Sequence, residues 1–194
     1  GILIRSTIRN DGSKETSGPV TDRWTNFRST GKIGSVQWAD SIDPADKVGY
    51  AYAWLPGEDG KTPSGNAKLK PGDEINIDRF LAVGRSPAEA VGVVSDRLGE
   101  KTGKMLIELR ESGGKAVSTG RLDLSFGGQV VPAYPDDKGR MKLHLPQGKV
   151  SAKFIDHGRA GFTRDFTVEA KDKELTLEIE PSSRIVFDVR KTAR

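Results

Sequence analysis

Apolar and polar residues alternate over short stretches along most of this chain, a pattern typical of half-buried β-strands. In residues 140–145, and again in residues 150–154, every second side chain is apolar. Asp136-Asp137-Lys138-Gly139 precedes the first stretch and Pro146-Gln147-Gly148 separates the two, and both are turn sequences. The segment 136–154 is therefore predicted to form a turn, a strand, a tight reversal and a second strand, as in a β-hairpin.

The same period of two recurs through the rest of the sequence, where clusters of Gly, Asn, Asp, Ser and Pro separate the stretches. In the first stretch, Ile2, Ile4 and Ile8 share one face of a strand. The strand candidates are residues 2–9, 20–27, 33–39, 50–55, 74–83, 105–109, 122–126, 130–134, 162–168, 175–179 and 185–189. Strands with one polar face are typical of antiparallel sheets, and two such sheets pack face to face as a sandwich.

One segment departs from this alternation and predicts a helix. Ser86-Pro87-Ala88-Glu89 is a capping box, with Ser at the N-cap, Pro at the first helical position and Glu at the third. Apolar residues follow at near-helical spacing, and Gly99 ends the pattern. We expect one helix at about residues 87–98. Gly92 lowers its intrinsic stability by about 1 kcal/mol relative to Ala, so the helix should depend on packing.

The composition changes along the chain and indicates two parts. All three tryptophans lie in the first third, whereas the apolar residues after residue 100 are mostly Leu, Val, Ile and Phe. We place a boundary at the helix. The predicted fold is mainly β, with two antiparallel β-sandwich modules at about residues 1–99 and 100–194 and a short helix between them. No low-complexity linker separates the modules, so we expect them to pack together.

The composition also excludes several kinds of function. The 194 residues include no cysteine and two histidines, which argues against thiolate chemistry and against a His-rich metal site. Acidic and basic residues are interleaved around a net charge of +4, so no basic block predicts nucleic-acid binding. No apolar run approaches the roughly 20 residues of a membrane span. We therefore expect no cofactor, no metal and no catalytic residue. Because the chain starts inside a strand-like pattern and without Met, we expect a fragment or a processed form.

The second module resembles the transthyretin-like, or prealbumin-type, sandwich known as the carboxypeptidase regulatory-like domain. The resemblance covers about residues 100–190 and rests on the signature Asp-x-x-Gly-Arg, an alternating strand, Leu-Pro-x-Gly and a second alternating strand. The matching residues are Asp136, Gly139, Arg140, Leu145, Pro146 and Gly148. This resemblance implies a fold rather than an activity.

The first module is similar to the region ahead of the PHP metal-dependent hydrolase domain in CehA/McbA-like proteins. The similarity rests on residues 69–73, on residues 79–84 and on the capped helix that follows them. In that family a supersandwich-like region precedes the transthyretin-like domain, which is the order that the two resemblances imply for this chain. The resemblance implies a non-catalytic upstream region of a larger, periplasmic or secreted hydrolase. Its partner would be a catalytic domain of the same polypeptide or another protein domain.

No catalytic residue can be transferred from that family to this chain. The PHP domain holds its metals on His and Asp clusters that include His-x-His, and this sequence contains no His-x-His. We therefore expect the chain itself not to be an enzyme. A glycosidase that works with carboxylates alone is a weaker alternative, because no pair of carboxylates stands out.

The aromatic residues of the first third raise an alternative function, carbohydrate binding, because flat aromatic faces suit sugar rings. Tyr50, Tyr52 and Trp54 have a period of two and share one face of a strand, which equally favours a core or an interface. The candidate ligand or interface aromatics are Trp24, Trp38, Tyr50, Tyr52 and Trp54.

The remaining polar candidates have simpler structural interpretations. His144 alternates with leucines and should face solvent, and His157 is expected in a turn. The carboxylates Asp40, Asp43 and Asp46 lack the spacing of a calcium loop, so a solvated turn is favoured over a cation site.

Overall fold

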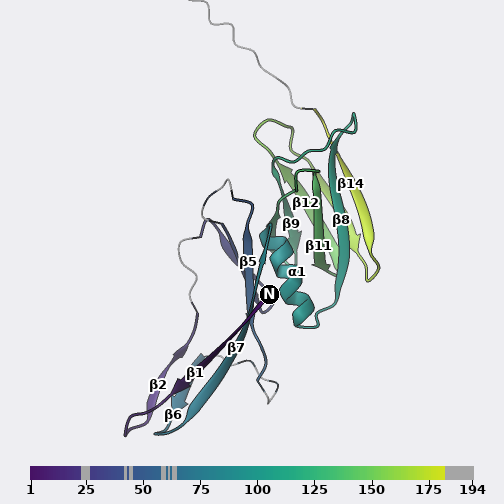
Figure 1. Ribbon diagram of the computed structural model, residues 1–194. Helices are drawn as coiled ribbons and strands as arrows, with labels where there is room; N and C mark the ends of the chain where they lie inside the picture. The colour runs from purple at the N-terminus through teal and green to yellow at the C-terminus, as the bar shows by residue number, and fades with distance from the viewer. Residues whose placement is uncertain are drawn as a thin grey trace, which may run out of the picture.

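The computed structural model describes residues 1–22, 27–41, 43, 46–57, 60, 62 and 65–181. Within them the protein is mainly β, with sheets around a single α-helix (Figure 1). The strands before the helix and the strands after it pair only among themselves in these residues. One hydrophobic cluster nevertheless includes residues of both parts. The division into two domains therefore stays a prediction, and we use "first module" and "second module" only for residues 1–99 and 100–194.

The first module contains a five-stranded antiparallel sheet in the order β1-β7-β5-β4-β3. Its strands are β1 (Ile2–Arg9), β3 (Thr30–Ile33), β4 (Val36–Asp40), β5 (Gly49–Trp54) and β7 (Glu74–Gly84). A separate two-stranded sheet consists of β2 (Thr16–Val20) and β6 (Gly65–Leu69). β1, β2, β6 and the first half of β7 project from the body, and we call them the arm (Figure 1).

Two predicted strands of this module differ from those in the structure. The stretch 33–39 is not one strand, because Gly34 takes a left-handed conformation with φ of 54° and reverses the chain between β3 and β4. The stretch 20–27 is not one strand either. β2 ends at Val20, Thr21 and Asp22 are not in a strand, and residues 23–26 lie outside the described part of the chain.

The second module is a sandwich of two sheets, as the transthyretin-like resemblance predicts. One sheet has the order β10-β9-β12-β13 and the other the order β11-β8-β14. The strands are β8 (Thr102–Glu111), β9 (Arg121–Phe126), β10 (Gln129–Ala133), β11 (Arg140–Pro146), β12 (Gly148–Ile155), β13 (Thr163–Val168) and β14 (Lys173–Ile179). β14 runs parallel to β8, and the other pairs are antiparallel. The predicted strand at residues 185–189 lies outside the described residues.

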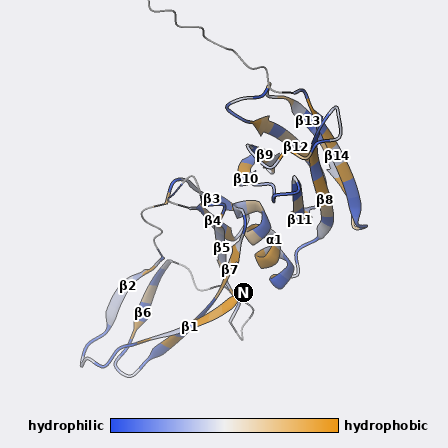
Figure 2. Ribbon diagram, turned by 45° about the horizontal axis from the view of Figure 1, so that its top comes forward, coloured by the Kyte–Doolittle hydropathy of each residue, from blue (hydrophilic) through white to orange (hydrophobic). Residues whose placement is uncertain are grey.

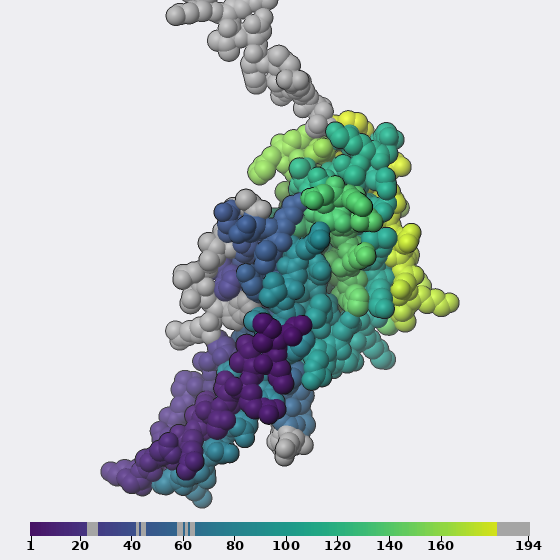
Figure 3. Space-filling model, in the orientation of Figure 1, coloured from purple at the N-terminus to yellow at the C-terminus, as the bar shows by residue number. Residues whose placement is uncertain are grey.

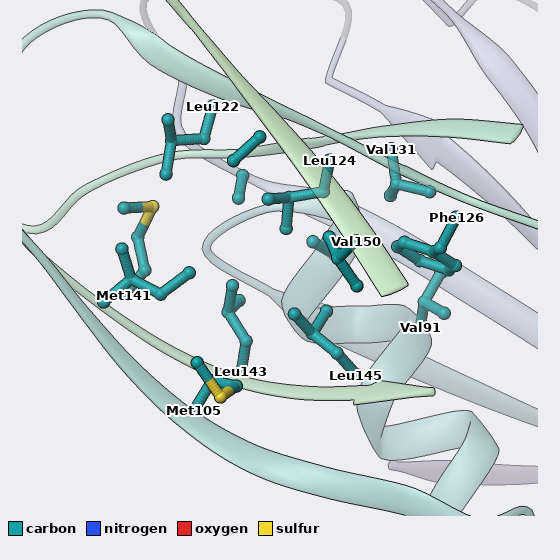
Figure 4. Close-up of a cluster of buried hydrophobic side chains, with 14 of the residues drawn as sticks. Val91, Met105, Leu122, Leu124, Phe126, Val131, Met141, Leu143, Leu145 and Val150 are labelled. Atoms are coloured by element: carbon teal, nitrogen blue, oxygen red, sulfur yellow. The ribbon is translucent and has the colours of Figure 1, made fainter. Parts of the chain in front are cut away.

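The inward side chains of both sheets form the core of the sandwich. Figure 4 shows leucines of β9 and β11 facing one another, with methionines at one end of the group. Leu122 and Leu124 of β9 and Phe154 of β12 have no measurable exposure. Burial of a side chain of this size contributes about 1.5–3 kcal/mol, so this core is the main source of the module's stability.

The segment 136–154 has the predicted strands but is not a hairpin. β11 pairs with β8, whereas β12 pairs with β9 and β13 in the opposite sheet. Pro146-Gln147-Gly148 therefore carries the chain from one sheet of the sandwich to the other. Pro146 has no N–H for a ladder hydrogen bond, and Gly148 has a φ of 129°, which is strained for residues with a side chain.

The helix α1 spans Pro87–Arg97, one residue less than predicted. The Ser half of the predicted capping box is present, because Ser86 Oγ accepts a hydrogen bond from Glu89 N at 3.3 Å. The Glu89 carboxylate accepts its hydrogen bond from Arg85 N, at 3.0 Å, which is one residue before the N-cap rather than the N-cap itself. Gly99, with a φ of 69°, follows the C-cap and ends the helix.

α1 lies between the five-stranded sheet and the sandwich and joins the two (Figure 1). It packs on β4, β5 and β7 on one side and on β10 and β11 on the other. Val91 and Val94 are buried, and Val91 reaches into the cluster that holds Leu145 and Phe126 (Figure 4). The helix thus has apolar packing contacts on both of its sides, as its expected dependence on packing requires.

Candidate interaction surface

The aromatic residues that the sequence suggests as ligand or interface candidates lie on both faces of the five-stranded sheet. Tyr50, Tyr52 and Trp54 alternate along β5 and share the face away from α1, whereas Trp38 of β4 belongs to the hydrophobic cluster that includes α1. Trp38 is 6% exposed and Tyr52 is 4% exposed, so neither offers a free ring face. Tyr50 is half-buried, with its ring centroid 5.6 Å from that of Phe27. Trp24 lies outside the described residues.

Trp54 is half-buried and takes part in a polar cluster. Asp22 Oδ2 accepts hydrogen bonds from Trp54 Nε1 and from Arg79 Nε, each at 2.6 Å. The Arg79 guanidinium lies 5.1 Å from the centroid of the indole, so a cation covers one face of this ring. A cavity of about 280 Å³ adjoins the cluster. Its lining includes Thr21, Asp22, Lys32, Gln37 and Trp54.

Asp40 lies in a buried polar cluster rather than in the solvated turn that was predicted. It is 0% exposed and forms an ion pair with Arg28 of the first module. The hydroxyl of Tyr134, from the second module, donates a hydrogen bond to Asp40 Oδ2 at 2.6 Å and accepts one from Arg28. Burial of the phenol, together with the neighbouring Asp40 carboxylate, raises the pKa of Tyr134 well above its ordinary value.

Lys47 adds a second polar contact between the modules. Its Nζ donates to the carbonyl oxygens of Ser118 and Pro135, at 2.7 and 2.9 Å. We call Arg28, Asp40, Tyr134 and Lys47 the junction cluster. Its side chains are all paired with one another or with backbone carbonyls, and these contacts link the two modules.

The two histidines occupy structural positions. His144 does not simply face solvent, because it is half-buried and its Nδ1 contacts the Asp96 carboxylate of α1. His157 is exposed in the bend after Asp156, in agreement with the expected turn. Asp43 is exposed, and its carbonyl accepts a hydrogen bond from Asp46 N, as in a turn.

The described residues contain no cluster of three or more His, Asp or Glu side chains that could hold a metal ion. They also contain no helix with the length and apolar character needed to cross a bilayer.

Exposed apolar side chains gather on β1. Ile2 is 56% exposed, Leu3 52%, and Ile4 and Ile8 39% and 41%. Figure 2 shows the start of β1 as hydrophobic, and Figure 3 shows the strand along the outside of the arm. The sequence pattern predicts correctly that the three isoleucines share a face. It does not predict that this face stays largely open to solvent.

β1 is also the edge of its sheet, and its backbone faces outward at alternate residues. Asn10 N donates to Asp73 O at 3.0 Å, which places the even-numbered residues of β1 in the hydrogen-bonded pairs with β7. Leu55 N donates to Asp78 O at 2.8 Å, so the even-numbered residues of β7 form their hydrogen-bonded pairs with β5 and not with β1. Both bonds agree that the odd-numbered residues of β1 direct their N–H and C=O groups away from the sheet.

The charged residues of β1 are neutralised within the chain. Arg5 donates two hydrogen bonds to the Asp78 carboxylate, at 2.9 and 3.0 Å, and this contact lowers the pKa of Asp78. Arg9 Nε lies 2.9 Å from Asp11 Oδ1.

Sequence reasoning did not identify the open edge or the junction cluster. The only available signals were the long alternating run at β1 and the polar residues that flank β4.

Comparisons with known proteins give no family assignment. No family model and no curated protein matches this chain. A DUF3823 family protein from Parabacteroides merdae is 14% identical with a TM-score of 0.37, over 42% of this chain and 47% of that chain. The Bacillus anthracis TIE protein is 12% identical with a TM-score of 0.37, over 91% and 34% of the respective chains. BcpA, the major pilin subunit of Bacillus cereus, is 11% identical with a TM-score of 0.32, over 70% and 38%. The chain thus spans less than half the length of each, and likenesses at this level carry no functional conclusion.

Proposed function

We propose that this chain is a non-catalytic structural and interaction module that holds two β modules rigidly together and presents the arm to a partner. The observation that carries the proposal is the way in which α1 joins the modules. α1 packs on both of them, and one hydrophobic cluster continues from Trp38 and Ala51 of the first sheet to Leu145 and Phe126 of the sandwich. The junction cluster adds charged contacts between the same two bodies.

The more specific form of the proposal is an upstream region of a larger PHP-type metal-dependent hydrolase. The turn sequences at Asp136 and at Pro146 support the transthyretin-like part of that resemblance, because they border β11 and connect the two sheets. In this arrangement the chain positions a catalytic domain of the same polypeptide, or docks onto another protein domain. The periplasm or the cell exterior is the expected place of such a protein.

Cooperative unfolding provides the first test of the proposal. All three tryptophans lie in the first module, so tryptophan fluorescence reports on that module and far-UV circular dichroism reports on both. We expect the two signals to change in one coincident transition with denaturant, as in a two-state protein. Two separated transitions would contradict the rigid unit. The same preparation should hydrolyse neither phosphoesters nor amides with added Mn²⁺ or Zn²⁺, and measured turnover would refute a non-catalytic role.

Carbohydrate binding remains the second candidate, and the cavity beside Trp54 favours it. A half-buried indole, a carboxylate, an ammonium group and an amide line the same cavity, which is the mixture of apolar and polar groups that sugar ligands need. We expect calorimetric titration with a panel of polysaccharides to give heat that Trp54→Ala abolishes. Tyr50→Phe serves as the control, because it removes the hydroxyl of an aromatic side chain outside the cavity lining. No heat with any polysaccharide would remove this candidate.

A further inference from the structure

We propose that β1 pairs antiparallel with β1 of a second copy of this chain, so that two five-stranded sheets join into one continuous sheet across a two-fold axis. The proposal goes beyond the function proposed above and does not depend on it. It rests on the open edge of β1, on the direction of its backbone groups and on the order of side chains along it.

The edge lacks most of the features by which natural sheets normally prevent such pairing. Edge strands are usually short, interrupted by Pro or a bulge, or protected by charged side chains, especially Lys. β1 is eight residues long and pairs with β7 in an unbroken register, without Pro, Lys or a bulge. Its two arginines are already paired with Asp78 and Asp11. In the described part of the chain no strand lies on the outer side of β1.

The backbone limits which registers are possible. Because the odd-numbered residues direct their hydrogen-bonding groups outward, an antiparallel partner must place odd residues opposite odd residues. Two such registers use nearly the whole strand. One has its two-fold axis at Arg5 and the other has it at Ser6.

Side-chain chemistry separates these two registers. The axis at Arg5 places this arginine directly opposite its own copy, and like charges in that position are unfavourable. The axis at Ser6 places Arg5 opposite Thr7 and Ile4 opposite Ile8. Ile4 of each copy then lies beside Ile8 of the other, while Ile2 lies opposite Asn10, so that the apolar face of β1 continues across the axis and Ile4 and Ile8 lose part of their contact with water.

Such an interface is isologous, since each contact occurs twice around the axis. It leaves the arginines with their present acidic partners, because Asp78 lies on β7 and Asp11 follows β1 in the same chain. A single pair of strands buries little area compared with a permanent dimer, so we expect association that depends on concentration.

A single cysteine tests the register, since the chain contains none of its own. With the axis at Ser6, the two Ser6 residues form a non-hydrogen-bonded pair with Cα atoms about 4.5 Å apart, a distance that suits a disulfide. Ser6→Cys should therefore oxidise to a covalent dimer. Ile4→Cys is the matched control, because its two copies would lie about 13 Å apart along the strand direction.

A second measurement does not depend on whether the cysteine variants fold normally. Sedimentation of the unmodified chain should show a shift with concentration from the 21.0 kDa monomer toward twice that mass. Ile8→Lys, at an exposed position, should abolish the shift and leave the circular dichroism spectrum unchanged. The proposal is overturned if the unmodified chain stays monomeric up to millimolar concentration, or if Ser6→Cys and Ile4→Cys cross-link equally. Neither of these results alters the cooperativity test of the proposed function.

Discussion

Replacement of Asp40 by Ala is expected to lower the free energy of unfolding by about 3 kcal/mol, at the low end of the range for breaking a buried ion pair. The Asp40 side chain is buried, and its carboxylate has contacts with the Arg28 guanidinium and the Tyr134 hydroxyl. Without it, the phenol hydroxyl remains buried without an acceptor for its proton. Arg28 is partly exposed and can turn toward water, which keeps the loss below the upper end of the range. Urea unfolding followed by tryptophan fluorescence measures the difference.

Asp11→Ala is the control for this measurement. Asp11 also forms an ion pair with an arginine, but its side chain is 79% exposed, so its removal should change stability by no more than about 0.5 kcal/mol. Equal effects of the two substitutions would show that the junction cluster adds nothing beyond a surface ion pair. Separation of the fluorescence and circular dichroism transitions in the Asp40→Ala variant would show further that the cluster couples the two modules.

The same variant should change the dependence of stability on pH. The pKa of Tyr134 is raised in the folded state, first by burial and then by its hydrogen bond to Asp40 and by the charge of that carboxylate. A raised pKa contributes stability that is complete below the unfolded value of about 10 and is lost as the pH rises above it. Stability of the unmodified chain should therefore fall above pH 10. In Asp40→Ala the fall should end at a lower pH and be smaller in total, because burial alone then raises the pKa of Tyr134.

The alternating pattern predicts individual strands well because it reports a local property, the side on which each residue is buried. β8, β9 and β11 follow it closely. Assignment of a strand to a sheet is not local. β11 and β12 have the pattern of a hairpin, yet they lie in opposite sheets, and only the backbone at Pro146 and Gly148 distinguishes the two cases.

The candidate site was harder to predict, because it depends on contacts between distant parts of the chain. Asp40 lies in a polar stretch typical of a turn, and it is buried because Tyr134 reaches it from 94 residues further along the chain. The isoleucines of β1 have the pattern of a core strand, and their exposure reflects the absence of a covering element in the described residues. The Gly34-Ser35 dipeptide, in contrast, is a hairpin signal that sequence reasoning could have used.

Gly92→Ala is expected to destabilise the protein by about 2 kcal/mol, although helix propensity alone predicts the opposite. Alanine would favour the helix by about 1 kcal/mol. A Cβ at residue 92, however, would lie 2.6 Å from the carbonyl oxygen of His144 and 2.9 Å from its Cβ on β11. The nearest obstacle is the backbone of β11, a strand of the sandwich that pairs with β8, rather than the end of a flexible side chain, so α1 must move away from β11. Overpacking of this kind costs up to about 3 kcal/mol, which exceeds the gain in propensity.

Val93→Ala provides the control on the same helix. Val93 is 40% exposed, so its truncation removes little packing and improves helix propensity, and the variant should be unchanged or slightly more stable. Urea unfolding of both variants compares the two positions directly. If Gly92→Ala proves more stable than the unmodified chain, then α1 does not contact β11 as closely as described, and the rigid connection between the modules must depend on the junction cluster instead. If it is destabilised as expected, the glycine that weakens the isolated helix is the residue that permits the helix to join the two modules.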